Sequence, residues 1–120
     1  MDKGCYMKTI IAGSRNCYNY NALLEAISQC GWTPSIIISG SARGVDKLGE
    51  KYAKLNDKQL ICFPAQWDKY GKKAGYLRNN DMVKKADALI ALWDGKSTGT
   101  AHMISKAREN NLLIYIKLVN

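Results

Sequence analysis

Two short segments rich in Gly, Ser and Thr hold the residues best suited to bind an anion. They are residues 39–46 (SGSARGVD), the first glycine segment, and residues 94–102 (DGKSTGTAH), the second glycine segment. Each lies between an apolar run typical of a strand and a run typical of a helix. The backbone N–H groups at the start of a helix have no partner within it, so a phosphate can accept hydrogen bonds from them. Two such junctions in one chain predict a single ligand site built from both.

The first glycine segment combines close backbone approach with hydroxyl groups. Glycine leaves room for a ligand, and serine adds a small donor and acceptor. The spacing matches neither G-x-G-x-x-G nor the P-loop. We expect ligand contacts from Ser39, Gly40, Ser41, Ala42, Gly44, Val45 and Asp46. Three alternatives stay open: the segment is a plain tight turn, Asp46 caps its helix instead of binding a ribose hydroxyl, and Arg43 faces either solvent or phosphate.

The second glycine segment follows the apolar run ALIALW and opens another predicted helix. Serine and threonine are favoured at the N-cap, and glycine leaves space beside the first N–H groups. We expect ligand contacts from Asp94, Ser97, Thr98, Gly99 and Thr100. A capped helix after a glycine turn is the alternative. His102 follows closely, and its role in ligand binding, in catalysis or in neither is left open.

Other stretches of the chain could complete such a site. The first apolar run ends in Gly13, Ser14 and Arg15. Residues 64–75 (PAQWDKYGKKAG) form the least regular stretch, predicted as a long loop that is either a lid or a surface connection anchored by Trp67. Trp67 could also stack on a base. The loop places three lysines close to Arg78 in the sequence, and this basic cluster is typical of a site.

The elements that position these residues alternate regularly along the chain. Periodicity and β-branched runs predict strands at residues 7–12, 35–39, 60–63, 88–93 and 112–118. Helices are predicted at residues 20–31, 44–56, 74–85 and 98–110. This order predicts an α/β fold, a three-layer Rossmann-like domain with a mainly parallel five-stranded sheet, in which residues 1–120 form a single domain. Ligands bind such sheets at the carboxyl ends of the strands, so the small-residue turns should converge there.

Composition restricts the partners. The chain has 18 Lys and Arg against 10 Asp and Glu, a formal charge of +8, which favours anionic partners. It has no apolar run of the ~20 residues that a membrane span needs and no secretory signal, so we expect a soluble cytoplasmic protein that enters no membrane. Its cysteines, Cys5, Cys17, Cys30 and Cys62, form no C-x-x-C pair. We therefore expect no metal, no cofactor and reduced thiols, with Cys30 and Cys62 in apolar settings.

Taken together, these segments resemble one known family. Gly13-Ser14-Arg15, SGSARGVD, AQWDKYGKKAGYLRN and ADALIALWDGKSTGTAHMI, in this order, are similar to the SLOG superfamily, in particular its YspA-like, YpsA-related branch. The similarity covers roughly residues 7–116 and extends to the Lonely Guy phosphoribohydrolases and the DNA-processing protein A family. The resemblance implies a Rossmann-like domain that binds nucleotides or nucleotide-derived ligands. It also implies that the two glycine segments are the binding motifs of that site. Arg78, followed by Asn79, stands where the hydrolases of the superfamily carry an arginine on their central helix.

The chain departs from the hydrolases of this superfamily at one position. Those enzymes carry a glutamate three residues after the Gly-Thr pair, and this chain has Met103 there. Glycoside cleavage needs a carboxylate to stabilise positive charge or to activate water. The resemblance therefore favours binding without turnover, unless Asp46 or another aspartate takes the place of the glutamate.

The leading hypothesis is that the protein binds a nucleotide or a nucleotide-derived signalling molecule, as a sensor or a sequestering protein. Arg15 and Arg78 would bind its phosphates. An N-glycosidic nucleotide hydrolase is the second hypothesis. Single-stranded nucleic-acid binding is the third hypothesis. The net charge favours it, but it ranks last because the basic residues are dispersed along the chain. The resemblance also implies a homo-oligomer, either a dimer or a tetramer.

Overall fold

The computed structural model describes residues 7–119 and contains a sheet of five strands, all parallel. The strands are β1 (Met7–Gly13), β2 (Pro34–Ser39), β3 (Gln59–Cys62), β4 (Ala88–Trp93) and β5 (Leu113–Leu118). Their order across the sheet is β3-β2-β1-β4-β5. The order reverses between β1 and β4, because the chain first builds outward on one side of β1 and then returns to its other side. The predicted α/β, Rossmann-like fold is confirmed.

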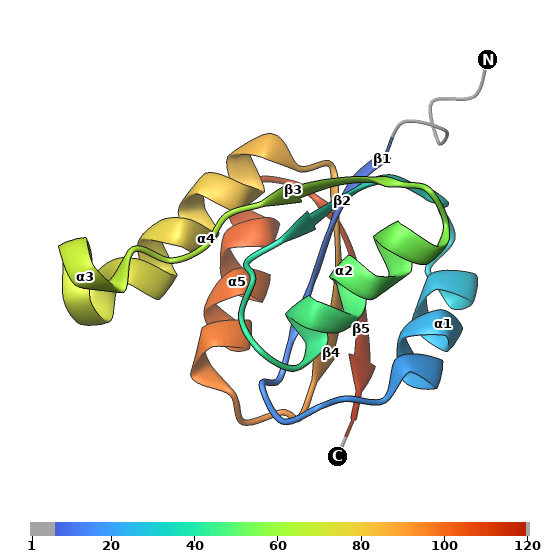
Figure 1. The fold of residues 1–120 in the computed structure, drawn as a ribbon, viewed down its shortest axis with the longest axis horizontal. Helices are drawn as coiled ribbons and strands as arrows, with labels where there is room; N and C mark the ends of the chain where they lie inside the picture. The colour runs from blue at the N-terminus through green and yellow to red at the C-terminus, as the bar shows by residue number, and fades with distance from the viewer. Residues whose placement is uncertain (1–6, 120) are drawn as a thin grey trace.

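Within residues 7–119, four helices of ten or more residues cover the two faces of the sheet (Figure 1). They are α1 (Tyr20–Gln29), α2 (Val45–Leu55), α4 (Ala74–Lys85) and α5 (Thr98–Glu109). Helices α1 and α2 pack on one face, and α4 and α5 pack on the other. Parallel crossovers are right-handed, so reversing the direction in which strands are added moves the helices to the opposite face.

Alternate residues of the central strands form the two apolar layers under these helices. Ile11 and Ile90 are register partners on the α1 and α2 side, whereas Ile10 and Leu89 are partners on the α4 and α5 side. All four side chains are completely buried. The continuous apolar runs of β1 and β4 follow from this burial on both faces.

Two expectations from the sequence are corrected by the structure. Residues 64–75 are not a loop throughout, because they contain α3 (Trp67–Tyr70) and the 3-10 helix η2 (Gly71–Lys73), which lead directly into α4. No residue of α3 or η2 is buried, so hydrophobic periodicity could not reveal them. Cys62, expected in an apolar setting, is exposed because it ends the edge strand β3. Cys5 lies outside the described residues.

Some features are not found in the part of the chain that the structure describes. No helix there has the length and apolar character needed to cross a bilayer. The same residues contain no group of three or more His, Cys, Asp or Glu that could hold a metal ion. Cys17, Cys30 and Cys62 are free thiols.

Candidate functional site

A cavity of about 430 Å³, the first cavity, opens where the strand order reverses, at the carboxyl ends of β1 and β4. Its walls come from the turn after β1, the first glycine segment, the short helices α3 and η2, the first part of α4 and the first turn of α5. The small-residue turns therefore meet at one edge of the sheet, as the sequence predicts.

The second glycine segment brings unpartnered N–H groups to the first cavity. The hydrogen bonds of α5 begin with Ala101 N, which donates to Ser97 O at 3.1 Å. Within the described residues, the N–H groups of Thr98, Gly99 and Thr100 have no acceptor. Ser97 occupies the N-cap position, but its hydroxyl pairs with Thr100 Oγ1 at 3.2 Å instead of capping an N–H group. An anion in the cavity can accept these hydrogen bonds at the favourable end of the helix dipole.

Asp94 shapes the turn before α5. Its Oδ1 accepts hydrogen bonds from the backbone N–H groups of Ser97 and Lys96, both at 2.8 Å. These two bonds lower the pKa of the Asp94 carboxyl below its usual value. Asp94 is not among the residues that line the first cavity, so its predicted contact with a ligand stays a prediction.

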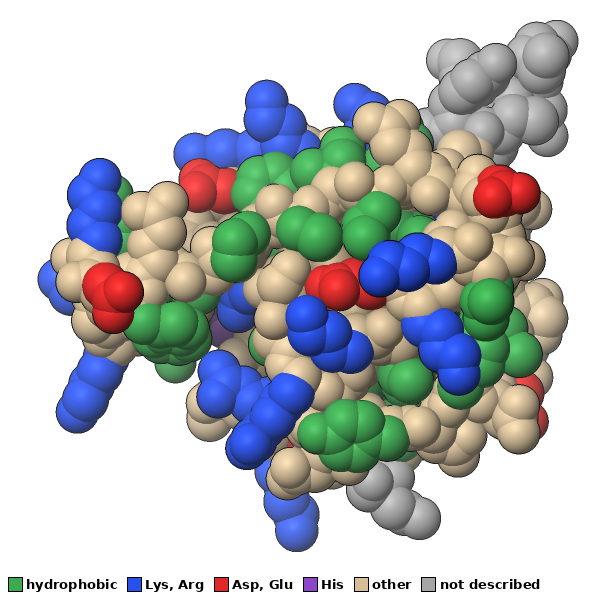
Figure 2. Space-filling model, in the orientation of Figure 1, with side chains coloured by type: hydrophobic (Ala, Val, Ile, Leu, Met, Phe, Trp, Pro, Cys, Tyr) green, Lys and Arg blue, Asp and Glu red, His purple; other side chains and the backbone are tan. Residues whose placement is uncertain are grey.

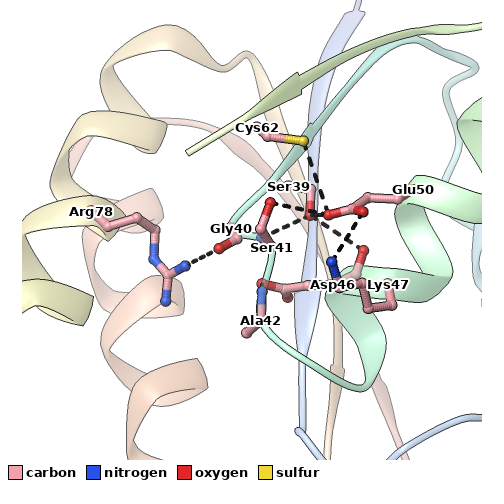
Figure 3. A network of polar contacts seen from close by, with 9 residues as sticks. All are labelled: Ser39, Gly40, Ser41, Ala42, Asp46, Lys47, Glu50, Cys62 and Arg78. Atoms are coloured by element: carbon pink, nitrogen blue, oxygen red, sulfur yellow. Dashed lines mark hydrogen bonds and ion pairs between the residues drawn. The ribbon is translucent and has the colours of Figure 1, made fainter. Parts of the chain in front are cut away.

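In the first glycine segment, the hydroxyl groups bind the protein itself (Figure 3). Ser39 Oγ donates to Glu50 Oε2 at 2.8 Å, and Ser41 Oγ donates to the same oxygen at 3.2 Å. Ser41 N in turn donates to Ser39 Oγ at 3.0 Å, and Ser39 is fully buried. Glu50 on α2 therefore anchors this turn. In the sequence Glu50 stands one helical turn after Asp46, and this spacing alone does not indicate that its carboxylate turns back to the two serines.

Asp46 brings a buried carboxyl to the wall of the first cavity. Its Oδ2 accepts a hydrogen bond from Ala42 N at 3.1 Å, which closes the turn before α2. Burial raises the pKa of Asp46 to about 6, although the Ala42 N–H group and the charge of Arg78 act in the opposite direction. The carboxyl thus holds the turn and also lines the cavity.

Arg78 links α4 to the first glycine segment. Its Nη1 donates to Gly40 O, and its Nε donates to Asn79 Oδ1 at 3.0 Å. A Cβ at Gly40 would overlap this guanidinium and lie 2.8 Å from Asp46 Oδ2, so a side chain there would displace Arg78 from its contact with Gly40 O. Burial lowers the pKa of Arg78, but a guanidinium stays charged at neutral pH.

Asn79 links α4 to α5. Its Nδ2 donates to Gly99 O at 3.4 Å and lies 3.2 Å from His102 Nδ1. The His102 ring packs on Tyr76, with ring centroids 4.4 Å apart. Burial and the charge of Lys106 lower the pKa of His102, which favours a neutral ring that accepts the Asn79 hydrogen bond. His102 does not line the first cavity and supports Asn79 instead.

Trp67 and two cations lie around the mouth of the first cavity. Trp67 is 49% exposed, and the Arg15 guanidinium carbon lies 6.0 Å from its ring centroid, within the range of a cation–π contact. Lys72 of η2 also lines the cavity. The stretch predicted as a loop therefore places one aromatic ring and one ammonium group at the site.

Ser14 and its neighbours hold the turns together beneath the cavity. Ser14 Oγ accepts a hydrogen bond from Asp94 N at 3.1 Å, and Ser14 O accepts one from Val45 N at 3.3 Å. Gly44 has a φ of 80° and lies against Ser14 O and the Arg15 backbone. These residues connect the two glycine segments to the end of β1.

The structure divides the site residues predicted from the sequence into two groups. Those that line the first cavity are Gly13, Arg15, Ala42, Asp46, Trp67, Arg78, Asn79, Ser97, Thr98, Gly99 and Thr100. Those that do not are Ser14, Ser39, Gly40, Ser41, Gly44, Val45 and Asp94. Lys72 and Tyr76 line the cavity without having been predicted. The cluster of basic residues beside Arg78 in the sequence could have pointed to Lys72. Nothing in the sequence pattern points to Tyr76.

Comparison with known proteins identifies relatives of this chain. The profile of the YAcAr family, described as the YspA, cpYpsA-related SLOG family, matches residues 7–70. The Gene 61 protein of Mycobacterium phage D29 is 35% identical over 111 residues, which cover 85% of this chain and 89% of that protein. The X-ray structure of DNA processing protein A (DprA) from Streptococcus pneumoniae matches with a TM-score of 0.74 at 17% identity, over 94% of this chain and 50% of that one. The chain therefore spans half the length of DprA, and this likeness concerns the fold alone.

Proposed function

The chain belongs to the YspA, cpYpsA-related SLOG family, and from that premise we propose that it binds a nucleotide or a nucleotide-derived molecule in the first cavity. Membership in this family indicates a nucleotide-related binding domain. One observation carries the finer proposal. The unpartnered N–H groups of the first turn of α5 open into the same cavity as Arg78 and Trp67.

Each part of the first cavity suits one part of such a ligand. The phosphate binds at the first turn of α5, where Lys72 and Arg78 add positive charge. A hydrogen bond to a charged group of this kind contributes about 1.5–3 kcal/mol. Trp67 offers a ring on which the base can stack. The volume of about 430 Å³ falls within the range of sites that enclose a small ligand.

The charge of the whole molecule supports an anionic ligand. The formal net charge is +8, and Figure 2 shows Lys and Arg side chains spread over the face that carries α2 and α3, with few acidic side chains between them. A field of this sign attracts anions and weakens as salt is added. Binding is therefore best measured at low ionic strength.

Met103 supports binding without turnover. It lines the first cavity at the position where the resembling hydrolases carry a glutamate, and it is almost completely buried. A thioether neither activates water nor stabilises a developing cation as a carboxylate does. We therefore propose that the protein acts as a sensor of its ligand or sequesters it.

Isothermal titration calorimetry with AMP and ADP at low salt tests the proposed site. We expect Lys72→Gln, which removes one cation of the cavity, to weaken binding about tenfold, the loss of one charge-assisted hydrogen bond. Lys54→Gln, on the exposed side of α2 and away from both cavities, is the matched control and should leave the affinity unchanged. Equal affinities of the two variants, or no binding of either nucleotide, would contradict the proposal.

Hydrolysis of an N-glycosidic bond is the second candidate function, and the carboxyl of Asp46 is the observation that favours it. Asp46 lines the first cavity, and burial raises its pKa to about 6, close to the value that suits a general acid at neutral pH. Incubation with AMP followed by chromatography for free adenine tests this function. Release of adenine by the natural protein, but not by Asp46→Asn, would establish it.

A further inference from the structure

A second cavity, of about 570 Å³, lies beside the first and has no role in the site proposed above. The first glycine segment and the residues that follow β3 form much of its wall. Its charged lining residues are Arg15, Arg43 and Arg78, and no Asp or Glu is among the described residues that line it. A concave surface with positive charge alone favours an anion.

Arg43 is the cation that belongs to the second cavity alone. Its side chain is exposed and makes no hydrogen bond or ion pair within residues 7–119. Arg78 already binds Gly40 O, and Arg15 lies against Trp67. The planar donors of Arg43 are therefore available to a phosphate in this cavity.

The two cavities share a wall. Arg15, Ala42, Trp67 and Arg78 line both of them, so the two cavities adjoin at these residues. Two guanidinium groups and an exposed indole ring suit the phosphate linkage and a stacked base of a ligand that occupies both. Each cavity alone has a volume in the range of a small-ligand site.

We propose that the second cavity binds the second half of a dinucleotide, a ligand of two nucleosides joined through phosphate. This inference rests on the nucleotide site proposed for the first cavity. One nucleotide lies in the first cavity with its phosphate at α5. The linking phosphate crosses the shared wall near Arg15 and Arg78, and the far half of the ligand reaches Arg43.

Calorimetric titration of the full chain with AMP and with the linear dinucleotide pApA tests this assignment. We expect pApA to bind at least tenfold more tightly than AMP, because it adds contacts in the second cavity. Arg43→Gln should weaken pApA binding about tenfold and leave AMP binding unchanged. Lys72→Gln should weaken both ligands, and Lys54→Gln should weaken neither.

The outcomes separate this inference from the proposed function. Equal affinity for AMP and pApA, or an Arg43→Gln variant that binds pApA as the natural protein does, overturns the second half-site and leaves nucleotide binding intact. Absence of binding by both ligands overturns the proposed function and the inference with it. Tighter binding of a single-stranded thymidine decamer than of pApA would assign both cavities to a nucleic-acid strand and overturn the proposal of a dinucleotide ligand.

Discussion

The two glycine segments, which follow β2 and β4 at the same edge of the sheet, differ in what their polar groups bind. In the first, the hydroxyl groups of Ser39 and Ser41 bind Glu50, and the Asp46 carboxyl binds Ala42 N. In the second, the N–H groups at the start of α5 have no acceptor within the described residues. The hydroxyl and carboxyl groups of the first segment are thus satisfied within the protein, which closes that turn, whereas the first N–H groups of α5 have no partner among the described residues.

Glycine serves a different purpose in each segment. At Gly40, the missing side chain lets the Arg78 guanidinium contact the backbone. At Gly99, a Cβ would meet nothing within 4 Å, so the space beside the first N–H groups of α5 stays empty. Replacing Gly40 should therefore affect the stability of the fold, and replacing Gly99 should affect binding more than stability.

Gly44→Ala should cause the largest loss of stability. Gly44 and Gly95 both have a φ of 80°, so alanine is strained at either position. A Cβ at Gly44 would also lie 2.5 Å from the backbone carbonyl of Arg15, whereas nothing lies within 4 Å at Gly95. We expect the free energy of unfolding, measured in urea, to fall by about 3 kcal/mol or more for Gly44→Ala and about 1 kcal/mol for Gly95→Ala. Equal losses would remove the distinction between the segments.

Asp46→Asn should reveal a pH-dependent stability in the first segment. Burial raises the pKa of Asp46 from 3.8 to about 6, so the folded protein prefers the protonated carboxyl. Its contribution to stability is therefore complete below pH 4 and is lost as the pH rises through 6. Asparagine keeps an oxygen for Ala42 N and has no charge. We expect the free energy of unfolding of the variant, measured in urea relative to that of the natural protein, to rise by about 2–3 kcal/mol as the pH increases from 4 to 7.

Asp94 in the second segment is the control for this pH experiment, because its pKa is shifted in the opposite direction to that of Asp46. Hydrogen bonds from Ser97 N and Lys96 N lower its pKa, so its contribution is present above the unfolded-state pKa and is lost as the pH falls through the folded value. Asp94→Asn should therefore lose stability relative to the natural protein as the pH rises from 2 to 5. The same direction for both variants would contradict the assigned causes.

Glu50→Ala should destabilise the fold by about 1–3 kcal/mol, because it removes the acceptor of two serine hydroxyl groups. Glu109→Ala is the matched control, since within residues 7–119 the Glu109 side chain forms only an exposed pair with Lys106, and its loss should change stability by less than about 0.5 kcal/mol. Thermal unfolding of both variants measures the difference. A Glu50 variant no less stable than its control would show that the first segment closes without this carboxylate.

Ser97→Ala should have the smallest effect. An N-cap serine that bonds an N–H group typically contributes about 1 kcal/mol, but the Ser97 hydroxyl pairs with Thr100 and caps none. We expect a change in the free energy of unfolding within about 0.5 kcal/mol. A loss of 1 kcal/mol or more would mean that the second segment is closed by its own side chains, as the first is.

The fold, and the edge of the sheet at which the first cavity lies, could be predicted from the sequence. Strands buried on both faces carry continuous apolar runs, such as the three isoleucines before Ser39, and parallel strands end at one edge of the sheet. The short helix α3 could not be predicted, because all its side chains are exposed and leave no periodic pattern.

The closure of the first glycine segment could not be predicted either. Ser39 and Ser41 are indistinguishable in the sequence from serines that are free to bind a ligand. The residue that binds them, Glu50, lies eleven and nine positions away, on a helix whose packing against the sheet decides where its carboxylate points. The oligomeric state implied by the family resemblance stays a prediction.

The hydrogen bonds of Ser14 join two parts of the chain that the ribosome synthesises far apart in time. Its N–H group donates to Leu92 O and its hydroxyl accepts from Asp94 N, 80 residues farther along the chain. The strand β1 is synthesised first and lies at the centre of the sheet, so one of its edges stays unpaired until β4 has emerged. An exposed strand edge can pair with other chains. The growing chain therefore exposes this strand edge until β4 has been synthesised, and the wall of the first cavity is complete only once α5 has followed.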